Sequence, residues 1–214
     1  KYETNVAAGL PVISTLENLI NSGDELVKIE AVLSGSLSYI FNNFSSSGSS
    51  FADVIRTAQS MGLTEPDPRE DLSGADVKRK LLILARDAGF NIEENDISTK
   101  GFLSEDALSA PTVDDFLKVL DKENDFFKAL VTEVEEKSEK LRFIASFSEG
   151  KGQISLKSVG SESPFYALSG SDNMIVFHSQ RYSNTPLVVR GPGAGADVTD
   201  AGVLAEIINL SNTL

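Results

Sequence analysis

The 214-residue sequence contains no cysteine and only one histidine, His178. Without cysteine the chain can form no disulfide, no thiolate metal site, no iron–sulfur cluster and no cysteine nucleophile. A single histidine also excludes metal sites built from several imidazoles and disfavours a histidine-dependent catalytic triad. Because His178 follows Val176 and Phe177 in a segment that predicts a strand, we expect it to have a structural role.

Positive charge is also scarce. The sequence has 19 Lys and Arg against 32 Asp and Glu, which gives a formal net charge of −13. Proteins that bind nucleic acids or anionic membranes need clustered basic residues, so we expect neither kind of partner. The hydrophobic fraction of 41% is ordinary for a globular protein, and this length supports one substantial core.

Long apolar runs are missing, since no segment approaches the roughly 20 residues that span a bilayer. The first residues match neither a signal peptide nor a transit peptide, and we therefore expect a soluble cytoplasmic protein. The chain does not begin with Met, and its first residues have the composition of a domain interior. We accordingly expect a piece of a longer polypeptide.

The first half of the sequence predicts mainly helices. Apolar residues at helical spacing predict helices over residues 10–20, 37–44 and 51–61. Residues 26–33 alternate in the manner of a half-buried strand. The charged region 93–139 predicts a solvated outer face with helices around residues 113–120 and 124–135.

Residues 62–71 contain two prolines separated by one residue, so we expect no helix in this segment. Ser73 followed by Asp76 resembles a capping box, which predicts a helix from Ser73 to about Ala88.

The last third predicts strands followed by a turn and a helix. Short β-rich segments occur at residues 141–147, 153–159, 174–179 and 186–189. A glycine-rich turn at residues 191–195 and a helix over 198–210 complete the chain. These elements predict an α+β fold, a mixed α/β sandwich in which a mostly antiparallel sheet is covered on one face by helices.

The densest group of ionisable side chains follows the two prolines. Asp76 and Lys80 are neighbours at i,i+4 on the flank of the apolar helix face, and Glu65 and Asp71 lie close before them in sequence. Three interpretations stay open. The pair could be an exposed ion pair worth about 0.3–0.5 kcal/mol. Lys80 could exchange a proton with a substrate hydroxyl or carbonyl while the acids bind a substrate ammonium. Asp67, Asp71 and Asp76 could bind a hard cation, although the lysine disfavours this.

Two other segments have small residues where a ligand could approach the backbone. Residues 191–199 place glycines before a helix, which suits a diphosphate, but the G-x-G-x-G spacing is not the dinucleotide fingerprint. Small residues in segment 3–10 leave carbonyl groups open to solvent or to a cation.

Four segments together resemble homoserine dehydrogenase. They are E-T-N-V-A-A-G-L-P at 3–11, S-G-S-L-S-Y-I-F-N at 34–42, G-L-T-E-P-D-P-R-E-D-L-S-G-A-D-V-K-R-K at 62–80 and G-A-G-A-D-V-T at 193–199. The resemblance covers essentially the whole chain in order. It is strongest to the homoserine dehydrogenase part of the bifunctional aspartokinase–homoserine dehydrogenases.

The resemblance implies reversible interconversion of L-homoserine and L-aspartate 4-semialdehyde with NADP or NAD, in threonine, isoleucine and methionine biosynthesis. By position, Lys80 matches the catalytic lysine that protonates the aldehyde oxygen, and Asp71 matches the acid that orients the reacting groups. Glu65 and Asp76 match substrate-binding acids, and Gly62 and Gly195 match cofactor-binding positions.

The resemblance also implies a monovalent cation site, sodium in the family, formed by the backbone carbonyls of Glu3, Val6, Ala8 and Leu10. Ala7 departs from this pattern, because the family usually has glycine there.

The organisation implied is a substrate-binding, catalytic and dimerisation domain over residues 1–214 that forms a homodimer. The family's N-terminal Rossmann domain, and possibly an aspartokinase domain, would belong to the parent protein. Residues 191–214 would pack toward the nucleotide-binding domain, without which we expect the fragment to be inactive. The alternative is a non-catalytic module of the same fold that binds a small molecule or only oligomerises.

Overall fold

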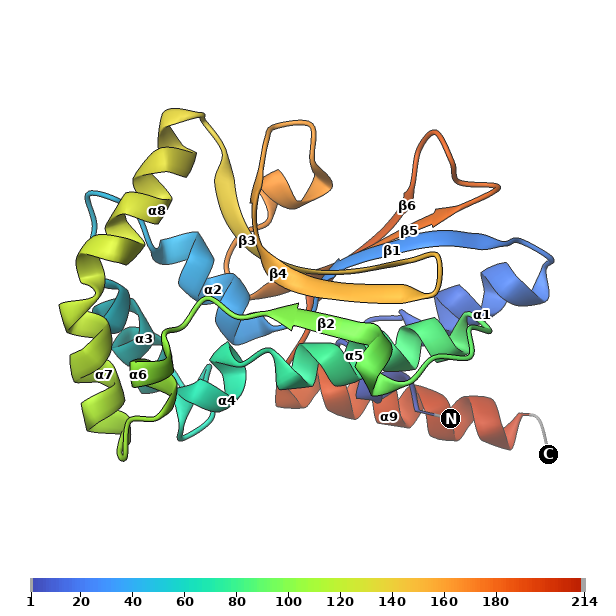
Figure 1. The fold of residues 1–214 in the computed structure, drawn as a ribbon. Coiled ribbons are helices and arrows are strands. Elements are labelled where there is room, and N and C mark those ends of the chain that lie inside the picture. The colour runs from blue at the N-terminus through green and yellow to red at the C-terminus, as the bar shows by residue number, and fades with distance from the viewer. Residues whose placement is uncertain (1, 213–214) are drawn as a thin grey trace.

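Six strands form an open sheet in the order β2-β4-β3-β1-β5-β6 in the computed structural model, which describes residues 2–212 (Figure 1). The strands are β1 (Leu26–Val32), β2 (Ile97–Lys100), β3 (Lys140–Ser148), β4 (Lys151–Val159), β5 (Asp172–Ser179) and β6 (Leu187–Pro192). All neighbouring strands are antiparallel except β2 and β4, which are parallel. The expected α+β class with a mostly antiparallel sheet is confirmed. Residues 1, 213 and 214, which end the expected domain, lie outside the described residues.

The helices lie against one face and one end of this sheet. They are α1 (Ile13–Asn21), α2 (Gly35–Asn43), α3 (Phe51–Ser60), α4 (Pro68–Leu72), α5 (Ala75–Asp87), α6 (Glu105–Leu108), α7 (Val113–Lys122), α8 (Asn124–Glu136) and α9 (Ala196–Ser211). Short 3₁₀ turns occur at η1 (Glu3–Asn5), η2 (Glu94–Asp96) and η3 (Pro164–Ala167). Figure 1 shows α1, α5 and α9 below the sheet, whereas α3, α6, α7 and α8 gather at its left end. No helix within residues 2–212 is long and apolar enough to cross a membrane.

The main core lies between the sheet and the helices below it. Ile29 and Ala31 of β1 and Phe177 of β5 are fully buried there with Leu81 and Leu84 of α5. A smaller cluster on the opposite face includes Phe165 and Leu168, which cover part of the other side of the sheet.

The buried Arg142 connects the segment around η3 to β3. Its guanidinium donates to the backbone carbonyls of Phe165 at 3.0 Å, Leu168 at 3.0 Å and Leu141 at 2.7 Å. Burial lowers the pKa of Arg142, and the carbonyl acceptors compensate the loss of water.

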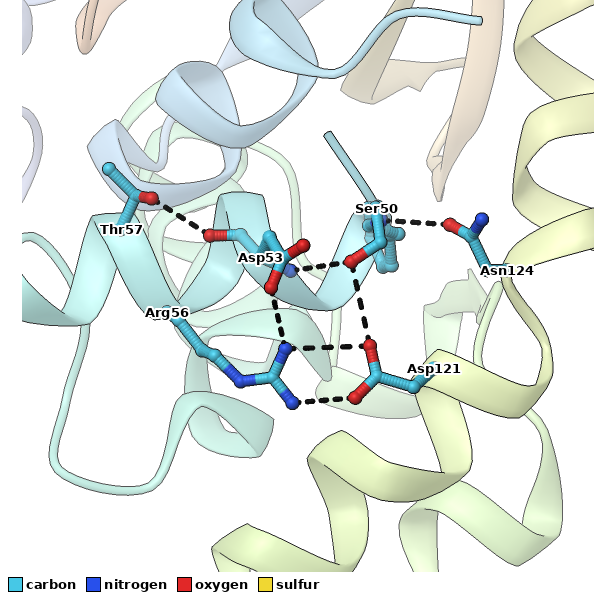
Figure 2. A network of polar contacts seen from close by, with 7 residues as sticks. Ser50, Asp53, Arg56, Thr57, Asp121 and Asn124 are labelled. Atoms are coloured by element: carbon cyan, nitrogen blue, oxygen red, sulfur yellow. Dashed lines mark hydrogen bonds and ion pairs between the residues drawn. The ribbon is translucent and has the colours of Figure 1, made fainter. Parts of the chain in front are cut away.

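The charged region 93–139 contributes more than the solvated face expected for it. Phe127 of α8 stacks on Phe51 of α3, with ring centroids 4.1 Å apart. Around this contact, Figure 2 shows Arg56 between Asp53 and Asp121, at 2.8 and 2.6 Å, while the Asn124 side chain accepts the Phe51 amide at 3.1 Å. These contacts join α7 and α8 to α3, and α3 leads directly into the segment that carries Glu65.

Two local predictions are wrong. Residues 68–72 form the helix α4, because Pro68 occupies the first helical position, where the missing amide costs nothing. The capping box of Ser73 and Asp76 does not form either: Gly74, with φ +73°, is the N-cap of α5, the Ser73 hydroxyl accepts the Ala75 amide at 3.2 Å, and Asp76 makes no capping bond. A side chain at Gly74 would approach the Phe143 ring to 2.9 Å, so the chain turns sharply between the two helices against β3.

An ion pair fixes the segment between Glu65 and α4. Asp67 caps α4 by accepting the Arg69 amide at 3.0 Å, and its carboxylate also accepts from the Arg69 guanidinium at 2.9 Å. Arg69 in turn donates to the Ala110 carbonyl and lies over the Phe116 ring. The segment is therefore attached to α7 and to the end of α6.

We expect Asp67→Asn to reduce the free energy of unfolding by about 1 kcal/mol at neutral pH, as for loss of a charge-assisted hydrogen bond. The hydrogen bond from Arg69 lowers the pKa of Asp67 in the folded state. A lowered carboxyl pKa stabilises the fold above its unfolded value of about 4, and this contribution is lost as the pH falls through the folded value. The difference in free energy of unfolding between parent and variant should therefore shrink below about pH 4, as measured by urea unfolding at several pH values.

The control is a double-mutant cycle. Arg69→Met should produce a similar loss of stability, and the double variant should lose less than the sum of the two single losses. Additive losses would contradict the pairing.

Candidate active site

A cleft of about 320 Å³ opens between the N-terminus of α2, the segment before α4, the first turns of α5 and the loop after β6. Its lining includes all six residues predicted from the sequence around the lysine and the glycines, which are Gly62, Glu65, Asp71, Asp76, Lys80 and Gly195. These residues come from two segments separated by more than 110 positions in the sequence. The cleft therefore brings the two segments 62–80 and 193–195 to one place.

The Lys80 ammonium is held at the side of this cleft by two partners. Its Nζ lies 2.7 Å from Asp76 Oδ2, and it donates to the Leu33 carbonyl at 3.0 Å. The Lys80 side chain is only 19% exposed, compared with 52% for Asp76. An ammonium has three donors. Two of them are used within the described part of the chain, and the third is able to meet a ligand oxygen in the cleft.

Asp71 connects both walls of the cleft. Its Oδ1 accepts from the Ser36 hydroxyl at 2.8 Å, and its Oδ2 accepts from the Glu65 amide at 2.8 Å. The first contact reaches the N-terminal turn of α2 and the second fixes the backbone of Glu65. By holding the Glu65 backbone, Asp71 determines the position from which the exposed Glu65 side chain extends.

Ser34 and Ser36, for which no role was predicted, also line the cleft. Ser34 caps α2 by accepting the Leu37 amide at 3.2 Å, and its hydroxyl lies 2.9 Å from that of Ser36. The segment S-G-S before an apolar helix is the available signal for the cap. The contact from Ser36 to Asp71 crosses 35 positions, and no local pattern indicates it.

The predicted cation-binding segment lies outside the lining of this cleft. The Glu3 carboxylate accepts the amides of Ile13 and Ser14 at 2.7 and 2.9 Å, at the start of α1. Ala7 and Ala8 have φ values of +61° and +52°, a left-handed conformation that glycine adopts with least strain. This conformation gives a physical reason for the glycine usual at position 7.

Two of the four predicted carbonyls already accept hydrogen bonds within the chain. Glu3 and Leu10 each accept one backbone amide, and a carbonyl oxygen has a second lone pair. Val6 and Ala8 are buried. Within residues 2–212, no group of three or more His, Asp or Glu side chains could hold a metal ion. A cation here would therefore depend on backbone oxygens.

His178 lies on the sheet face away from this cleft. Its Nε2 is 3.2 Å from Glu30 Oε2, and Glu30 also pairs with Lys28 at 2.9 Å. This row of side chains crosses from β1 to β5, and the structural role expected for His178 stays a prediction.

Comparison with known proteins gives the same assignment over nearly the whole chain. A family model described as Homoserine dehydrogenase matches residues 11–208. The chain is 44% identical to the chloroplastic bifunctional aspartokinase/homoserine dehydrogenase 2 of Zea mays, with 100% of this chain and 23% of that protein covered. It is 43% identical to the homoserine dehydrogenase of Schizosaccharomyces pombe, with 98% of this chain and 57% of that protein covered. The chain thus spans about a quarter of the bifunctional relative and just over half of the other.

Solved structures share the fold. A Candida auris protein described as of unknown function superposes with a TM-score of 0.92 at 38% identity, over 99% of this chain and 61% of that one. A mutant of a hyperthermophilic archaeal homoserine dehydrogenase, in complex with NADPH, has a TM-score of 0.70 at 25% identity, over 100% of this chain and 56% of that one. With a family match over 11–208 and a cleft lined by the residues that carried the resemblance, the chain belongs to the homoserine dehydrogenase family.

Proposed function

We propose that this chain is the catalytic and dimerisation domain of an enzyme that interconverts L-homoserine and L-aspartate 4-semialdehyde with NADP or NAD. The observation that carries the proposal is the Lys80 ammonium, held by Asp76 and the Leu33 carbonyl at the side of a cleft that Glu65 and Asp71 also line. An ammonium with one free donor suits proton delivery to an aldehyde oxygen. The carboxylates suit the ammonium of an amino-acid substrate.

In the reducing direction, Lys80 donates its proton to the aldehyde oxygen, which becomes the hydroxyl of homoserine. In the oxidising direction, the neutral amine takes the hydroxyl proton. The nicotinamide, when bound, supplies or accepts the hydride. Asp71 orients the reacting groups through its contacts with Ser36 and Glu65, while Glu65 and Asp76 bind the substrate ammonium.

Glycines make room for the cofactor at two places in the cleft. Gly62 has φ +69° with open space where a side chain would be, and Gly195 has φ +128°. We propose that both lie against the nicotinamide end of the cofactor, because only a backbone without Cβ lets a flat ring approach closely. The structurally similar archaeal homoserine dehydrogenase holds NADPH. The adenosine end requires a Rossmann domain, which we place in the rest of the parent polypeptide.

Helix α9 supports this arrangement. Its apolar side chains are half exposed: Val203 43%, Leu204 57%, Ile207 60%, Ile208 50% and Leu210 53%. A row of this kind is normally covered by another part of the protein. We propose that residues 191–214 pack toward the nucleotide-binding domain.

The protein's assembly and location follow from the same proposal. We propose a homodimer, in which the sheet face carrying Lys28, Glu30 and His178 is available for a second copy. The identities of 44% to the bifunctional Zea mays relative and 43% to the Schizosaccharomyces pombe homoserine dehydrogenase fit a parent with or without an aspartokinase domain equally well. We propose the cytoplasm as the location, because a chain without cysteine suits a reducing compartment.

The decisive variant is Lys80→Ala in the complete polypeptide that contains this chain. We expect kcat for homoserine oxidation to fall about 10²- to 10⁴-fold, the usual contribution of a positioned general acid or base. The matched control is Lys78→Ala, on the same helix but 3.7 Å from Glu94 at the other side, which should leave kcat within a factor of two or so.

Spectrophotometric assay of NADPH formation measures both variants. Undiminished turnover in Lys80→Ala would contradict the catalytic role. A parent protein that binds homoserine but never oxidises it would favour the non-catalytic module.

We also propose that the carbonyls of Glu3, Val6, Ala8 and Leu10 bind sodium. The unfolding midpoint of the chain should then be about 2–4 °C higher in sodium chloride than in tetramethylammonium chloride of equal ionic strength, since a ligand of the folded state raises stability. Tetramethylammonium is too large to enter a carbonyl cage and serves as the ionic-strength control. Equal midpoints in scanning calorimetry would remove the proposed cation.

A further inference from the structure

Asn173, near the start of β5, is fully buried without a hydrogen-bond partner for its side chain. Its exposed fraction is 0%, and neither Oδ1 nor Nδ2 has a partner among residues 2–212. A buried amide that makes no hydrogen bond is destabilising, whereas a leucine has the same number of side-chain heavy atoms and no polar group to satisfy. Such a group in a folded protein calls for an explanation.

The position of Asn173 relates it to the cleft. In β5 it alternates with Ile175 and Phe177, whose side chains face the helix-covered core. Asn173 comes one residue before Met174, which pairs with Val32 of the antiparallel strand β1, and the residue after Val32 is Leu33, whose carbonyl holds Lys80. Asn173 therefore lies at the same level of the sheet as the anchor of the proposed catalytic lysine.

The other neighbour of Asn173 is the turn after β6. A Cβ placed on Gly193 would lie 2.0 Å from Nδ2 and 2.1 Å from Cγ of Asn173, so only glycine fits over the amide. Gly193, Ala194 and Gly195 all line the cleft. The backbone of this turn thus separates the free amide from the space where a ligand would sit.

We propose that Asn173 is a positioning residue for the turn 193–195. When cofactor and substrate fill the cleft, the turn settles onto Asn173, and the amide donor and acceptor hold the C=O and N–H of the turn's peptide groups. An asparagine amide offers the same pair of functions as a peptide group and is complementary to it. The proposal rests on the proposed function, because it takes the nicotinamide cofactor to be the ligand that closes the turn.

Ligand binding would then complete an interaction that the Asn173 amide does not make with any of residues 2–212. The cost of the unpartnered amide falls on the ligand-free protein, and its relief adds to the affinity for the cofactor. A residue that served only to fill space would contribute nothing to cofactor affinity.

The test compares Asn173→Leu with Asn124→Leu in the complete polypeptide. Asn124 is the matched control because its side chain accepts the Phe51 amide in the helical end of the molecule, away from the cleft (Figure 2). Three quantities are measured: the unfolding midpoint without ligand, the Kd for NADPH by fluorescence titration, and hydrogen exchange of the peptide containing residues 193–195 with and without NADPH.

The two variants should have opposite signatures. Asn173→Leu should keep or raise the unfolding midpoint, weaken NADPH binding about tenfold and abolish the slowing of exchange that NADPH produces at residues 193–195. Asn124→Leu should lower the midpoint while leaving the Kd and the protection unchanged. The homoserine assay should show a raised KM for the cofactor in Asn173→Leu.

Unchanged NADPH affinity and unchanged protection in Asn173→Leu would overturn the positioning role. If that variant does not fold, Asn173→Ser, which is smaller and polar, is measured in the same way. A parent that oxidises homoserine but gains no protection at residues 193–195 with NADPH overturns the positioning role alone. A parent that does not oxidise homoserine overturns the proposed function, and the positioning role with it.

Discussion

The ammonium of Lys80 is the group on which the arrangement of the cleft depends. A cation whose side chain is only 19% exposed has lost much of its hydration, and the protein must replace that hydration with oxygen atoms at fixed places. One oxygen comes from Asp76, one helical turn earlier on α5, and the other from the carbonyl of Leu33, just after β1. The need to hold the ammonium between these two oxygens therefore fixes α5 against the end of the central strand β1. Lys80 is therefore tied to α5 and to the residue directly after β1, and so to the central strand of the sheet.

The acidic residues in and near the cleft make different contacts although they are close in sequence. Asp71 is directed inward, with both oxygens bonded to the protein, whereas Glu65 is exposed and reaches outward from a backbone that Asp71 holds. Asp67 is used a third way, as the helix cap and ion-pair partner of Arg69, and so cannot serve as the cation ligand considered for it. Most of the net charge of −13 lies elsewhere on the surface. Only a few carboxylates line the cleft, and the contacts of each determine which part it can play.

The sequence predicted the elements with clear periodicity and failed where the outcome depends on distant residues. The strands from residue 141 onward and the helices at 113–120 and 124–135 were found because their apolar spacing is regular. Strand β2, with one buried residue in four, has no such pattern and exists because β4 pairs with it. The helix at Pro68 was missed because proline at a first helical position was taken for a helix breaker.

The same division applies to the cleft. The proximity of Asp76 and Lys80 follows from helix geometry, and local spacing alone was enough to predict it. The contact of Ser36 with Asp71, and that of Lys80 with Leu33, join residues 35 and 47 positions apart. The resemblance supplied the membership of the cleft, including Gly195, but not the contacts that hold it together. Those contacts require the packed sheet, which no local pattern contains.

The glycine-rich turn shows how one pattern can have separate physical causes. Its spacing resembles a phosphate-binding loop, yet each glycine meets a different requirement in the fold. A side chain at Gly191 would approach Leu10 to 2.9 Å, one at Gly193 would overlap Asn173, and Gly195 has φ +128° immediately before α9. Two of the three glycines are therefore explained by close packing, and only the third by backbone conformation. Because this turn packs so closely on the sheet, it can respond to a ligand only through its backbone. The hydrogen-bond partners of its peptide groups therefore decide whether it moves.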